Sequence, residues 1–399
     1  MTLSLQEANL LDRGVAEVID RKSLQAKLGR NKPLRVKLGI DATGYQLHLG
    51  HVVPLRKLRA FQEAGHTAVL IIGDFTAQIG DPSGRDKSRS ALSAEQTKKF
   101  AETYLEQVGR VIDIRRTETH YNSEWFSTFS AADFLRLMMS ASANQLLTHD
   151  TFRKRIQQGL PLGLHELTYP VLQGYDSVAV RADVELGGTD QKFSLLTGRD
   201  IQAAYGVEKQ DIMLFEYLLG VDGKEKMSKS LGNIIAIDDA PNDMYGKTMS
   251  IPDKLMLQYF TLATDSPAEE LLEIRAELKK KATNPRDVKA RLARTIVTQY
   301  HGAAAAQEAE FEFAHVHQKG GQPTDMTSIE VRGGEHNILN LLVNYKLAAS
   351  RSEARRLVEQ GGVKIDQRTI TDWQEPVVIV QGAVLQVGKR KFIKLVTTP

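Results

Sequence analysis

The sequence predicts an α/β protein with a Rossmann-like, doubly wound parallel sheet that carries a helical insertion and is followed by further domains. Three observations lead to this fold class. Residues 34–40 alternate apolar and polar side chains, residues 49–65 carry apolar side chains on one helical face, and residues 68–74 (AVLIIGD) begin with an unbroken apolar run. Strand, helix and strand in that order are typical of a βαβ unit. A continuously apolar strand is one that helices cover on both faces.

Length and composition narrow the class of protein. With 399 residues, 42% of them hydrophobic, the chain has the composition of a globular protein of two or three domains. No apolar run approaches the roughly 20 residues of a membrane-spanning helix, and the N-terminus has no secretory signal pattern. The absence of cysteine excludes disulfides, thiolate nucleophiles and cysteine-ligated metals. No membrane partner and a cytoplasmic location are therefore expected.

The net charge of +3 is unevenly distributed. Residues 333–399 hold ten Lys and Arg against six Asp and Glu, a balance of +4, whereas the first 332 residues sum to −1. A basic C-terminal module on a near-neutral body indicates a polyanionic partner. On charge alone, a solvated surface explains the pattern equally well.

The elements outside the βαβ unit are predicted from periodicity and turn residues. In chain order they are a helix at 4–30, a mostly helical stretch at 95–160, strands near 182–186 and 211–215 with a helix from about 190 between them, an all-helical stretch at 237–318, helical segments at 341–347 and 350–362, and β-like runs at 363–365, 377–380 and 392–396. The domain boundaries that follow are 1–236 for the sheet domain with its insertion at about 92–165, 237–318 for a helical domain, 319–335 for a linker rich in Gly, Pro and Thr, and 336–399 for a small α+β domain.

The first motif that indicates chemistry is His48-Leu49-Gly50-His51, where the first strand passes into the helix. Residues three apart share a helical face, and the first turn of a helix exposes free N–H groups at the positive end of its dipole. Two imidazoles there, with Gly50 allowing close approach to the backbone, suit phosphate oxygens. The alternative is a helix start with two incidental histidines.

The second motif is Lys226-Met227-Ser228-Lys229-Ser230, in a polar stretch after the second half of the sheet. Two lysines in a short loop can neutralise the charge that develops on a leaving polyphosphate. Taken alone, the pentamer is explained as well by an exposed basic turn.

The two motifs together resemble those of class I aminoacyl-tRNA synthetases: HLGH is similar to HIGH, and KMSKS matches the second motif letter for letter. Their order and separation also fit that family. The motifs do not choose the amino acid. That choice rests on residues 165–180 (HELTYPVLQGYDSVAV), where Tyr169, Gln173 and Asp176 stand at i, i+4 and i+7 on an otherwise apolar helix. A solvated polar stripe is the alternative reading of this spacing.

The helix at 165–180 resembles the YPxxQxxD helix of tyrosyl-tRNA synthetases. The resemblance to this family extends along nearly the whole chain. GIDATGYQLHLGH (39–51), IGDPSGR (79–85) and ELGGTDQ (185–191) are similar to further family segments. The resemblance implies that ATP is bound by Gly39, Asp41, His48, Gly50, His51, Gly188, Asp190 and Lys229. It implies that tyrosine is bound by Asp81, Tyr169, Gln173, Asp176 and Gln191, with Asp176 receiving the phenol hydroxyl. It implies that Thr43, His48, His51, Arg85, Arg89, Lys226 and Lys229 act in catalysis.

The chain departs from the family pattern next to the tyrosine site. Lys37 replaces the Tyr that many members place there as a second partner of the phenol. Strand alternation puts Lys37 on the same face as Gly39 and Asp41, so it is included among the tyrosine-binding residues. Ile40-Asp41-Ala42 also replaces Phe-Asp-Pro.

Residues 336–399 are similar to the ribosomal-protein-type RNA-binding module that ends bacterial tyrosyl enzymes. SRSEARRLVEQGGVKID (350–366) carries the match, with Arg351, Arg355 and Arg356 as RNA-binding residues. A charged helix facing solvent is the alternative.

The resemblance therefore implies a tyrosine–tRNA ligase, with 237–318 as its anticodon-side domain. ATP with Mg²⁺, L-tyrosine and tRNA(Tyr) are the implied substrates, no tightly bound protein metal is expected, and a homodimer is implied through the insertion, where 135–139 (LRLMM) is a contact or ordinary core. Two other classes stay open: a tryptophan-specific or other nucleotidyl-transferring relative, and a synthetase-derived RNA-binding or splicing factor.

Overall fold

The computed structural model describes residues 10–30, 32–82, 92–280, 282–318, 326–388 and 391–398. The chain divides into two compact units, 1–307 and 308–399, which are described separately. Within the described residues, no helix is long and apolar enough to cross a membrane.

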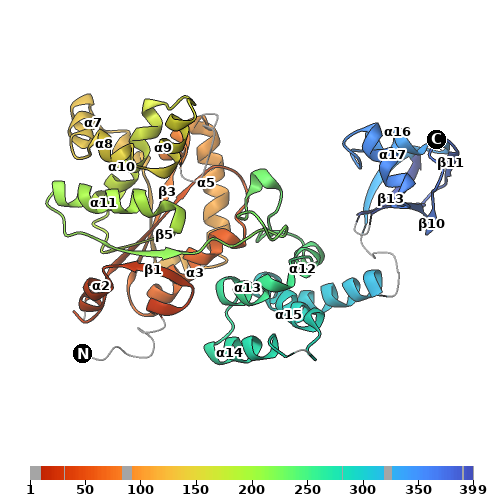
Figure 1. The fold of residues 1–399 in the computed structure, drawn as a ribbon, viewed down its shortest axis with the longest axis horizontal. Helices are drawn as coiled ribbons and strands as arrows, with labels where there is room; N and C mark the ends of the chain where they lie inside the picture. Colours follow the sequence, from red (N-terminus) through yellow and green to blue (C-terminus); the bar gives the residue numbers. More distant parts are fainter. Residues whose placement is uncertain are drawn as a thin grey trace. The chain divides into compact units, whose positions relative to one another are not determined.

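The first unit is built on a six-stranded sheet with the order β1-β6-β5-β2-β3-β4 (Figure 1). All neighbouring strands are parallel except β1, which runs antiparallel to β6 at one edge. The strands are β1 (Val15–Ile19), β2 (Arg35–Asp41), β3 (Thr67–Gly73), β4 (Thr117–Tyr121), β5 (Val184–Gly188) and β6 (Asp211–Phe215). The predicted doubly wound parallel sheet is thus confirmed.

The strand order reverses between β2 and β5. From β2 the chain continues to β3 and β4 on one side, then returns to β5 and β6 on the other. In open α/β sheets, ligands bind at such a reversal, at the carboxyl ends of the strands. The sheet therefore places a site where Asp41 ends β2 and Gly188 ends β5.

Helices cover the sheet and build the insertion. Helix α3 (Leu49–Glu63) follows β2 and buries Leu49, Val52, Leu55, Leu58 and Phe61 completely. The others in this part are α2 (Arg21–Leu28), α4 (Thr76–Ile79), α5 (Ala94–Val108), α6 (Ser123–Phe126), α7 (Ala131–Met138), α8 (Ala143–Leu146), α9 (Asp150–Gln157), α10 (Leu164–Ala179) and α11 (Lys192–Ala204).

The prediction of one helix over residues 4–30 is wrong for its described part. Gly14 has a φ of 68°, a left-handed conformation that ends the preceding turn, and β1 follows at once. Asp20 then caps α2 by accepting a hydrogen bond from the Ser23 N–H. The apolar residues of β1 pair with β6, a contact that local periodicity does not reveal.

The insertion also contains a strand that the helical pattern hides. Residues 117–121 (TETHY) form β4 and pair in parallel with β3. All five side chains are half-buried, because β4 lies at the edge of the sheet. An edge strand needs no apolar run, so its sequence gave no strand signal.

The predicted all-helical stretch at 237–318 consists of helices joined by short turns. They are α12 (Pro241–Met249), α13 (Met256–Ala263), α14 (Ala268–Glu277) and α15 (Pro285–Gln318), the last interrupted at Gly302, whose φ of 84° is not helical. Arg56 and Arg59 of α3 bind the Asp265 carboxylate just after α13. These ion pairs join the helical part to the helix that begins with the first motif.

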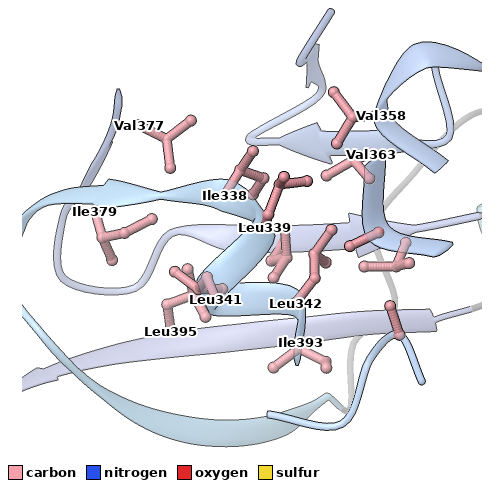
Figure 2. Close-up of a cluster of buried hydrophobic side chains, with 14 of the residues drawn as sticks. Ile338, Leu339, Leu341, Leu342, Val358, Val363, Val377, Ile379, Ile393 and Leu395 are labelled. Carbon is pink, nitrogen blue, oxygen red and sulfur yellow. The ribbon is translucent and has the colours of Figure 1, made fainter. Parts of the chain in front are cut away.

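The second unit has its own core. A five-stranded sheet, β10-β9-β12-β13-β7, and a two-stranded antiparallel sheet, β11-β8, pack with two helices around the apolar cluster in Figure 2, which includes Leu342, Val358 and Leu395. The elements are β7 (Thr327–Arg332), β8 (Gly334–Asn337), α16 (Ile338–Asn344), α17 (Arg351–Glu359), β9 (Val363–Ile365), β10 (Arg368–Thr369), β11 (Pro376–Ile379), β12 (Val384–Val387) and β13 (Lys391–Thr398).

The predicted linker at 319–335 needs a correction at its end. Strand β7 lies inside that range and pairs in parallel with β13 over its whole length. Its partner lies more than 60 residues further along the chain, so only the tertiary structure reveals the pairing. The remaining domain boundaries stay predictions.

Candidate active site at the carboxyl ends of the strands

The two histidines of the first motif stack at the start of α3. Their ring centroids are 3.8 Å apart, and His51 Nδ1 accepts a hydrogen bond of 3.2 Å from the His48 backbone N–H. The His48 ring lies over Gly50, where a Cβ would come within 3.0 Å of it. Gly50 therefore makes room for His48 itself, rather than only for a ligand.

Both imidazoles are neutral at pH 7. Burial, together with the nearby Lys229 and Lys226, lowers the pKa of His48 to about 3. Burial and His48 hold the pKa of His51 well below its usual value. The pair can therefore donate N–H groups to phosphate or ribose oxygens, while the positive charge of the site comes from the lysines.

The two motifs lie side by side. His48 and Ala236 form an isolated β-bridge, in which Leu49 N–H donates to the Ile235 carbonyl at 3.0 Å and Ile237 N–H donates to the Leu47 carbonyl at 3.1 Å. The segment that carries KMSKS is thus fixed to the segment that carries HLGH, although about 180 residues separate them in the sequence. The fold therefore brings the two motifs together.

The lysines of KMSKS contact other predicted site residues. Lys226 forms an ion pair with Asp190, which ends the β5 turn. Lys229 Nζ donates to the Tyr104 hydroxyl at 2.7 Å and lies 3.0 Å from where a Cβ of Gly44 would be. Both ammonium groups therefore border the crevice between β2 and β5.

Asn233 fixes the KMSKS loop and was not among the predicted site residues. Its Oδ1 accepts from the Ser228 N–H at 2.8 Å, and its Nδ2 donates to Asp222 at 2.8 Å and to the Lys226 carbonyl. A side chain bonded to three parts of one loop restricts where both lysines can go. The only signal for Asn233 in the sequence was an amide residue just after the motif.

The turn after β5 holds its shape through glycines. Gly188 N–H donates to Gln191 Oε1 at 3.0 Å, and a Cβ on Gly188 would collide with the Asp190 carboxylate. Across the crevice, a Cβ on Gly39 would meet no atom within 4 Å, so space is open beside the end of β2. Thr43 follows in a tight turn whose N–H donates to the Asp41 carbonyl.

The polar side chains of α10 meet the sheet at the same edge. The Tyr169 hydroxyl donates to Asp41 Oδ2 at 3.0 Å, and Thr76 Oγ donates to Asp41 Oδ1 at 2.8 Å. Burial and Asp41 raise the pKa of Tyr169 well above its usual value, so its hydroxyl stays protonated. The predicted tyrosine and ATP residues therefore share a boundary at Asp41.

Asp176 lies two helical turns beyond Tyr169 on α10 and is 3% exposed. It accepts hydrogen bonds from Trp125 Nε1 at 3.0 Å and from Asn122 Nδ2 at 3.3 Å. Asn122 also donates to Thr76 Oγ at 2.9 Å, so hydrogen bonds run from Asp176 to Asp41. Burial raises the pKa of Asp176 to about 7.

Asn122 and Trp125 were missed because β4 was missed. Asn122 is the first residue after that strand, a position where polar side chains commonly face the ligand crevice of an α/β sheet. Had TETHY been recognised as a strand, Asn122 and Trp125 would have been candidates because they follow its carboxyl end.

Lys37 does not reach the crevice. It is completely buried, and its ammonium group contacts Glu185 at 2.8 Å, Ser177 Oγ at 2.8 Å and the Gln173 carbonyl at 3.1 Å. An ammonium group has three protons, and these three acceptors use all of them. All three protons of the Lys37 ammonium group are therefore bonded to other residues of the protein, and none is left for a ligand.

Several predicted residues have no full description here. Arg85 and Arg89 lie outside the described residues, as do the last two residues of the GDPSG segment. Asp81, at the described end of this loop, follows Gly80, whose φ of 85° turns the chain after α4. Arg351, Arg355 and Arg356 lie on α17 in the second unit and are exposed.

Three buried polar atoms of predicted site residues lack a hydrogen-bond partner among the described residues: His48 Nδ1, Gln173 Oε1 and Asp190 Oδ1. Buried polar atoms are nearly always paired, so unpaired ones need an explanation. All three belong to residues assigned to ATP or tyrosine, and a polar substrate would satisfy them.

A groove of about 470 Å³ adjoins Asp190. It lies between the start of α9 and the start of α11, and its lining includes His149, Lys154, Thr189 and Lys192. Two lysines, Lys154 and Lys192, and two aspartates, Asp150 and Asp190, line this groove. Periodicity and motifs gave no sign of it.

Comparisons with known proteins identify the family of the chain. Residues 29–318 match the family of class I tRNA synthetases (W and Y), and residues 319–394 match the tyrosine–tRNA ligase SYY-like C-terminal domain. The chain is 48% identical over 396 residues to the tyrosine–tRNA ligase of Moorella thermoacetica, covering 98% of this chain and 96% of that protein. It is 47% identical to the tyrosine–tRNA ligase of Thermotoga maritima, covering 98% and 97%.

Solved structures agree in fold. A tyrosyl-tRNA synthetase from Archaeoglobus fulgidus, complexed with L-tyrosine, has a TM-score of 0.62 at 19% identity and covers 76% of this chain and 99% of that chain. The tryptophanyl-tRNA synthetase of Plasmodium falciparum has a TM-score of 0.57 at 16% identity, covering 74% and 81%. At such identities the likeness concerns the fold alone, and the nearly full-length sequence matches decide the family. The chain belongs to the class I tRNA synthetases and, within them, to the tyrosine–tRNA ligases.

Proposed function

We propose that this protein activates L-tyrosine with ATP to tyrosyl-adenylate and pyrophosphate, and then transfers tyrosine to the 3′ end of tRNA(Tyr). The observation that carries the proposal is the meeting of HLGH, KMSKS and the β5 turn, together with the buried, hydrogen-bonded carboxylate of Asp176 on α10. The nearly full-length similarity to tyrosine–tRNA ligases supports it.

In the first step, a tyrosine carboxylate oxygen attacks the α-phosphorus of ATP, and the bond to pyrophosphate breaks. The attacking group is already ionised, so no general base is needed, in keeping with the two neutral histidines. His48 and His51 donate hydrogen bonds to ATP, and Lys226 and Lys229 stabilise charge on the leaving pyrophosphate. Positioning and electrostatics supply the catalysis, with no covalent intermediate on the enzyme.

Around the nucleotide, Gly39 gives ATP room at the end of β2, and Gly188 with Asp190 binds the ribose. Asp41, Thr43 and Gly50 complete the contacts on the β2 side, and Arg85 with Arg89 adds cations for pyrophosphate. ATP brings Mg²⁺ as part of the substrate, because Mg²⁺ prefers phosphate oxygens and water to an all-protein cage.

Around tyrosine, Asp81, Tyr169 and Gln173 bind the ammonium group, Gln191 orients the carboxylate, and Asp176 accepts the phenol O–H. The unpaired Gln173 Oε1 supports this assignment, because an ammonium group would satisfy it. A tryptophan-specific relative is disfavoured by Asp176, and a purely RNA-binding protein would have no use for a paired HLGH and KMSKS. Charging of tRNA with labelled tyrosine tests the complete reaction, and absence of charging by active protein would contradict it.

Arg351, Arg355 and Arg356 on α17 bind the phosphates of tRNA in this proposal. Arg355 also pairs with Glu359 at 2.7 Å and stacks on the Trp373 ring, 4.7 Å from its centroid, which orients the guanidinium. Because tRNA works in translation, we place the enzyme in the cytoplasm.

Truncation after Gln318 is expected to leave tyrosine activation intact and to reduce tRNA charging sharply. The first unit retains its own core, while the lost cations supply phosphate affinity and orientation. The measurement compares pyrophosphate exchange, tRNA charging and the tRNA Kd at several salt concentrations for both lengths. The log–log salt slope should fall by roughly one for each lost phosphate contact. Unimpaired charging, or lost activation in a folded fragment, would contradict this division of labour.

We further propose a homodimer formed through the insertion. In the LRLMM segment, Leu137 is buried, but Leu135 is 67% and Met139 is 86% exposed. They lie one helical turn apart, and Leu164 in the same insertion is 81% exposed. Exposed apolar residues grouped in this way are typical of interaction surfaces.

Replacing Leu135 and Met139 by aspartate is expected to convert the dimer to a monomer, because burying two carboxylates at an apolar interface is unfavourable. Sedimentation velocity measures the change in mass. Leu272→Asp, at a residue of α14 that is 66% exposed, is the matched control and should leave the mass unchanged. A monomeric wild type, or a double variant that stays dimeric, would refute this interface.

A further inference from the structure

A buried ion pair lies beneath the turn of α10 that carries Asp176. Lys37 of β2 and Glu185 of β5 are partners in the parallel register of the two strands at the reversal point. Their side chains are 0% and 2% exposed, and their charged atoms are 2.8 Å apart. The pair thus lies between the sheet and α10, directly beneath the helix that carries the tyrosine-binding residues.

The hydrogen bonds of this pair are saturated by the chain. Lys37 donates to Glu185, to Ser177 Oγ and to the Gln173 carbonyl. The other Glu185 oxygen accepts from Ser177 Oγ at 3.1 Å and from Gln210. No donor of Lys37 is left for a substrate, so any effect on the reaction must pass through the groups that it holds.

Those groups flank Asp176. Gln173 and Ser177 are three residues before and one residue after it on α10, so Lys37 fixes the helical turn on which Asp176 stands. From the other side, Trp125 and Asn122 hold the carboxylate itself. The carboxylate is therefore oriented by neutral donors above and by the ion pair beneath.

Stability alone gives little reason for such a pair. Desolvating two charges costs several kcal/mol, and packed apolar residues of similar size commonly serve a protein core as well or better. The positive charge does act on Asp176: burial raises the pKa of this carboxyl, Lys37 lowers it, and Glu185 raises it. Lys37 thereby offsets part of the cost of ionising a carboxyl in an apolar pocket.

We propose that Lys37 and Glu185 are positioning residues that set the specificity for a phenol hydroxyl, by fixing the Gln173–Ser177 turn and by keeping Asp176 an ionised acceptor. This inference rests on the proposed tyrosine activation. It also gives Lys37 a different task from the one expected for it, since Lys37 acts on the substrate only through Asp176.

The groups around Asp176 define what a pH experiment would observe. Lys37 on β2 and Glu185 on β5 face it from the sheet, Asn122 and Trp125 face it from the segment after β4, and Tyr169 on α10 is close enough for Asp176 to raise its pKa. Asp41, at the end of β2, is joined to Asp176 through Thr76 and Asn122. Of these charged groups, only Lys37 and Glu185 can be changed without altering a proposed substrate contact.

The test measures kcat/KM for tyrosine-dependent and phenylalanine-dependent pyrophosphate exchange from pH 5.5 to 9. The ratio of the two isolates the phenol hydroxyl, because groups that act on both substrates cancel. Lys37→Met removes the positive charge, so the acidic limb of the ratio should move to higher pH. Glu185→Gln removes the negative charge but keeps an acceptor for Lys37, so the limb should move to lower pH. A shift of one pH unit changes the ratio about tenfold on the acidic side.

Lys27→Met is the matched control. Lys27 of α2 and Asp211, the first residue of β6, form another buried ion pair, 3.2 Å apart with side chains 2% and 1% exposed. Breaking it should lower thermal stability and leave the limb in place. The proposal would be overturned if the acidic limb of the ratio stayed in place in both Lys37→Met and Glu185→Gln, or moved in the same direction in both.

The result remains decisive if Lys37→Met does not fold, because Glu185→Gln alone must move the limb to lower pH. Failure of the proposed function has a different signature, the absence of tyrosine-dependent exchange in the wild type. A wild type that selects tyrosine, with a ratio unaffected by Glu185→Gln, would refute only the role of the ion pair.

Discussion

Lys229→Ala is expected to slow adenylate formation by about 10²–10³-fold, because a preorganised donor to developing charge is worth about 2.7–4 kcal/mol in the transition state. Lys229 borders the crevice between Gly44 and Tyr104, within reach of a polyphosphate there. The tyrosine Kd should hardly change, since Lys229 is not among the proposed tyrosine contacts. Single-turnover adenylate formation and equilibrium tyrosine binding measure the two quantities separately.

Lys224→Ala provides the matched control for that loss. Lys224 is exposed and precedes the motif in the same loop, so its removal takes away a cation without touching the crevice. Its rate should match that of the wild type. A weaker tyrosine Kd with an unchanged chemical step in Lys229→Ala would contradict the role of Lys229.

Asp176→Asn is expected to lower kcat/KM for tyrosine by about 10–150-fold, since hydrogen bonds to charged groups are worth about 1.5–3 kcal/mol. Asp176 accepts from two donors, Trp125 and Asn122, and must accept from the phenol as well. An amide has only one oxygen, so its NH₂ must face one of these three donors. Phenylalanine should lose much less, which makes the tyrosine-to-phenylalanine ratio the measurement. An unchanged ratio would refute the assignment of Asp176.

The sequence predicted those parts of the fold that local patterns specify. Residues 68–74 gave β3 because a strand covered on both faces is apolar throughout, and the helical face of α3 gave its buried side. It did not predict β1, β4 or β7. Each of these pairs with a distant segment, and such pairing depends on the sheet that is already formed.

The candidate site divides in the same way. Its motifs could be recognised because they combine uncommon residues at fixed spacing, and the fold brings HLGH, KMSKS and the β5 turn together. The residues that hold the motif residues in place could not be recognised. Asn122 and Trp125 act through hydrogen bonds to Asp176, which is distant in sequence, and Asn233 acts through hydrogen bonds that depend on how its own loop folds. The burial of Lys37 depends on Glu185 of the neighbouring strand.

The pKa of His48, about 3, changes how the first motif works. At the sequence level, two histidines at a helix N-terminus suggest a site for phosphate oxygens. Burial keeps them uncharged, so they act as oriented N–H donors, and the lysines of KMSKS carry the charge. Because the histidines are uncharged, His48 can lie near Lys226 and Lys229 without electrostatic repulsion.

The central claim is that Asp176 and the residues around it select tyrosine for activation by ATP. Isotope exchange between pyrophosphate and ATP, measured with the full-length protein and one amino acid at a time, tests it most directly. The account predicts rapid exchange with tyrosine and far slower exchange with phenylalanine or tryptophan at the same concentration. Exchange that tryptophan supports as well as tyrosine, or no exchange with tyrosine by folded protein, would contradict it.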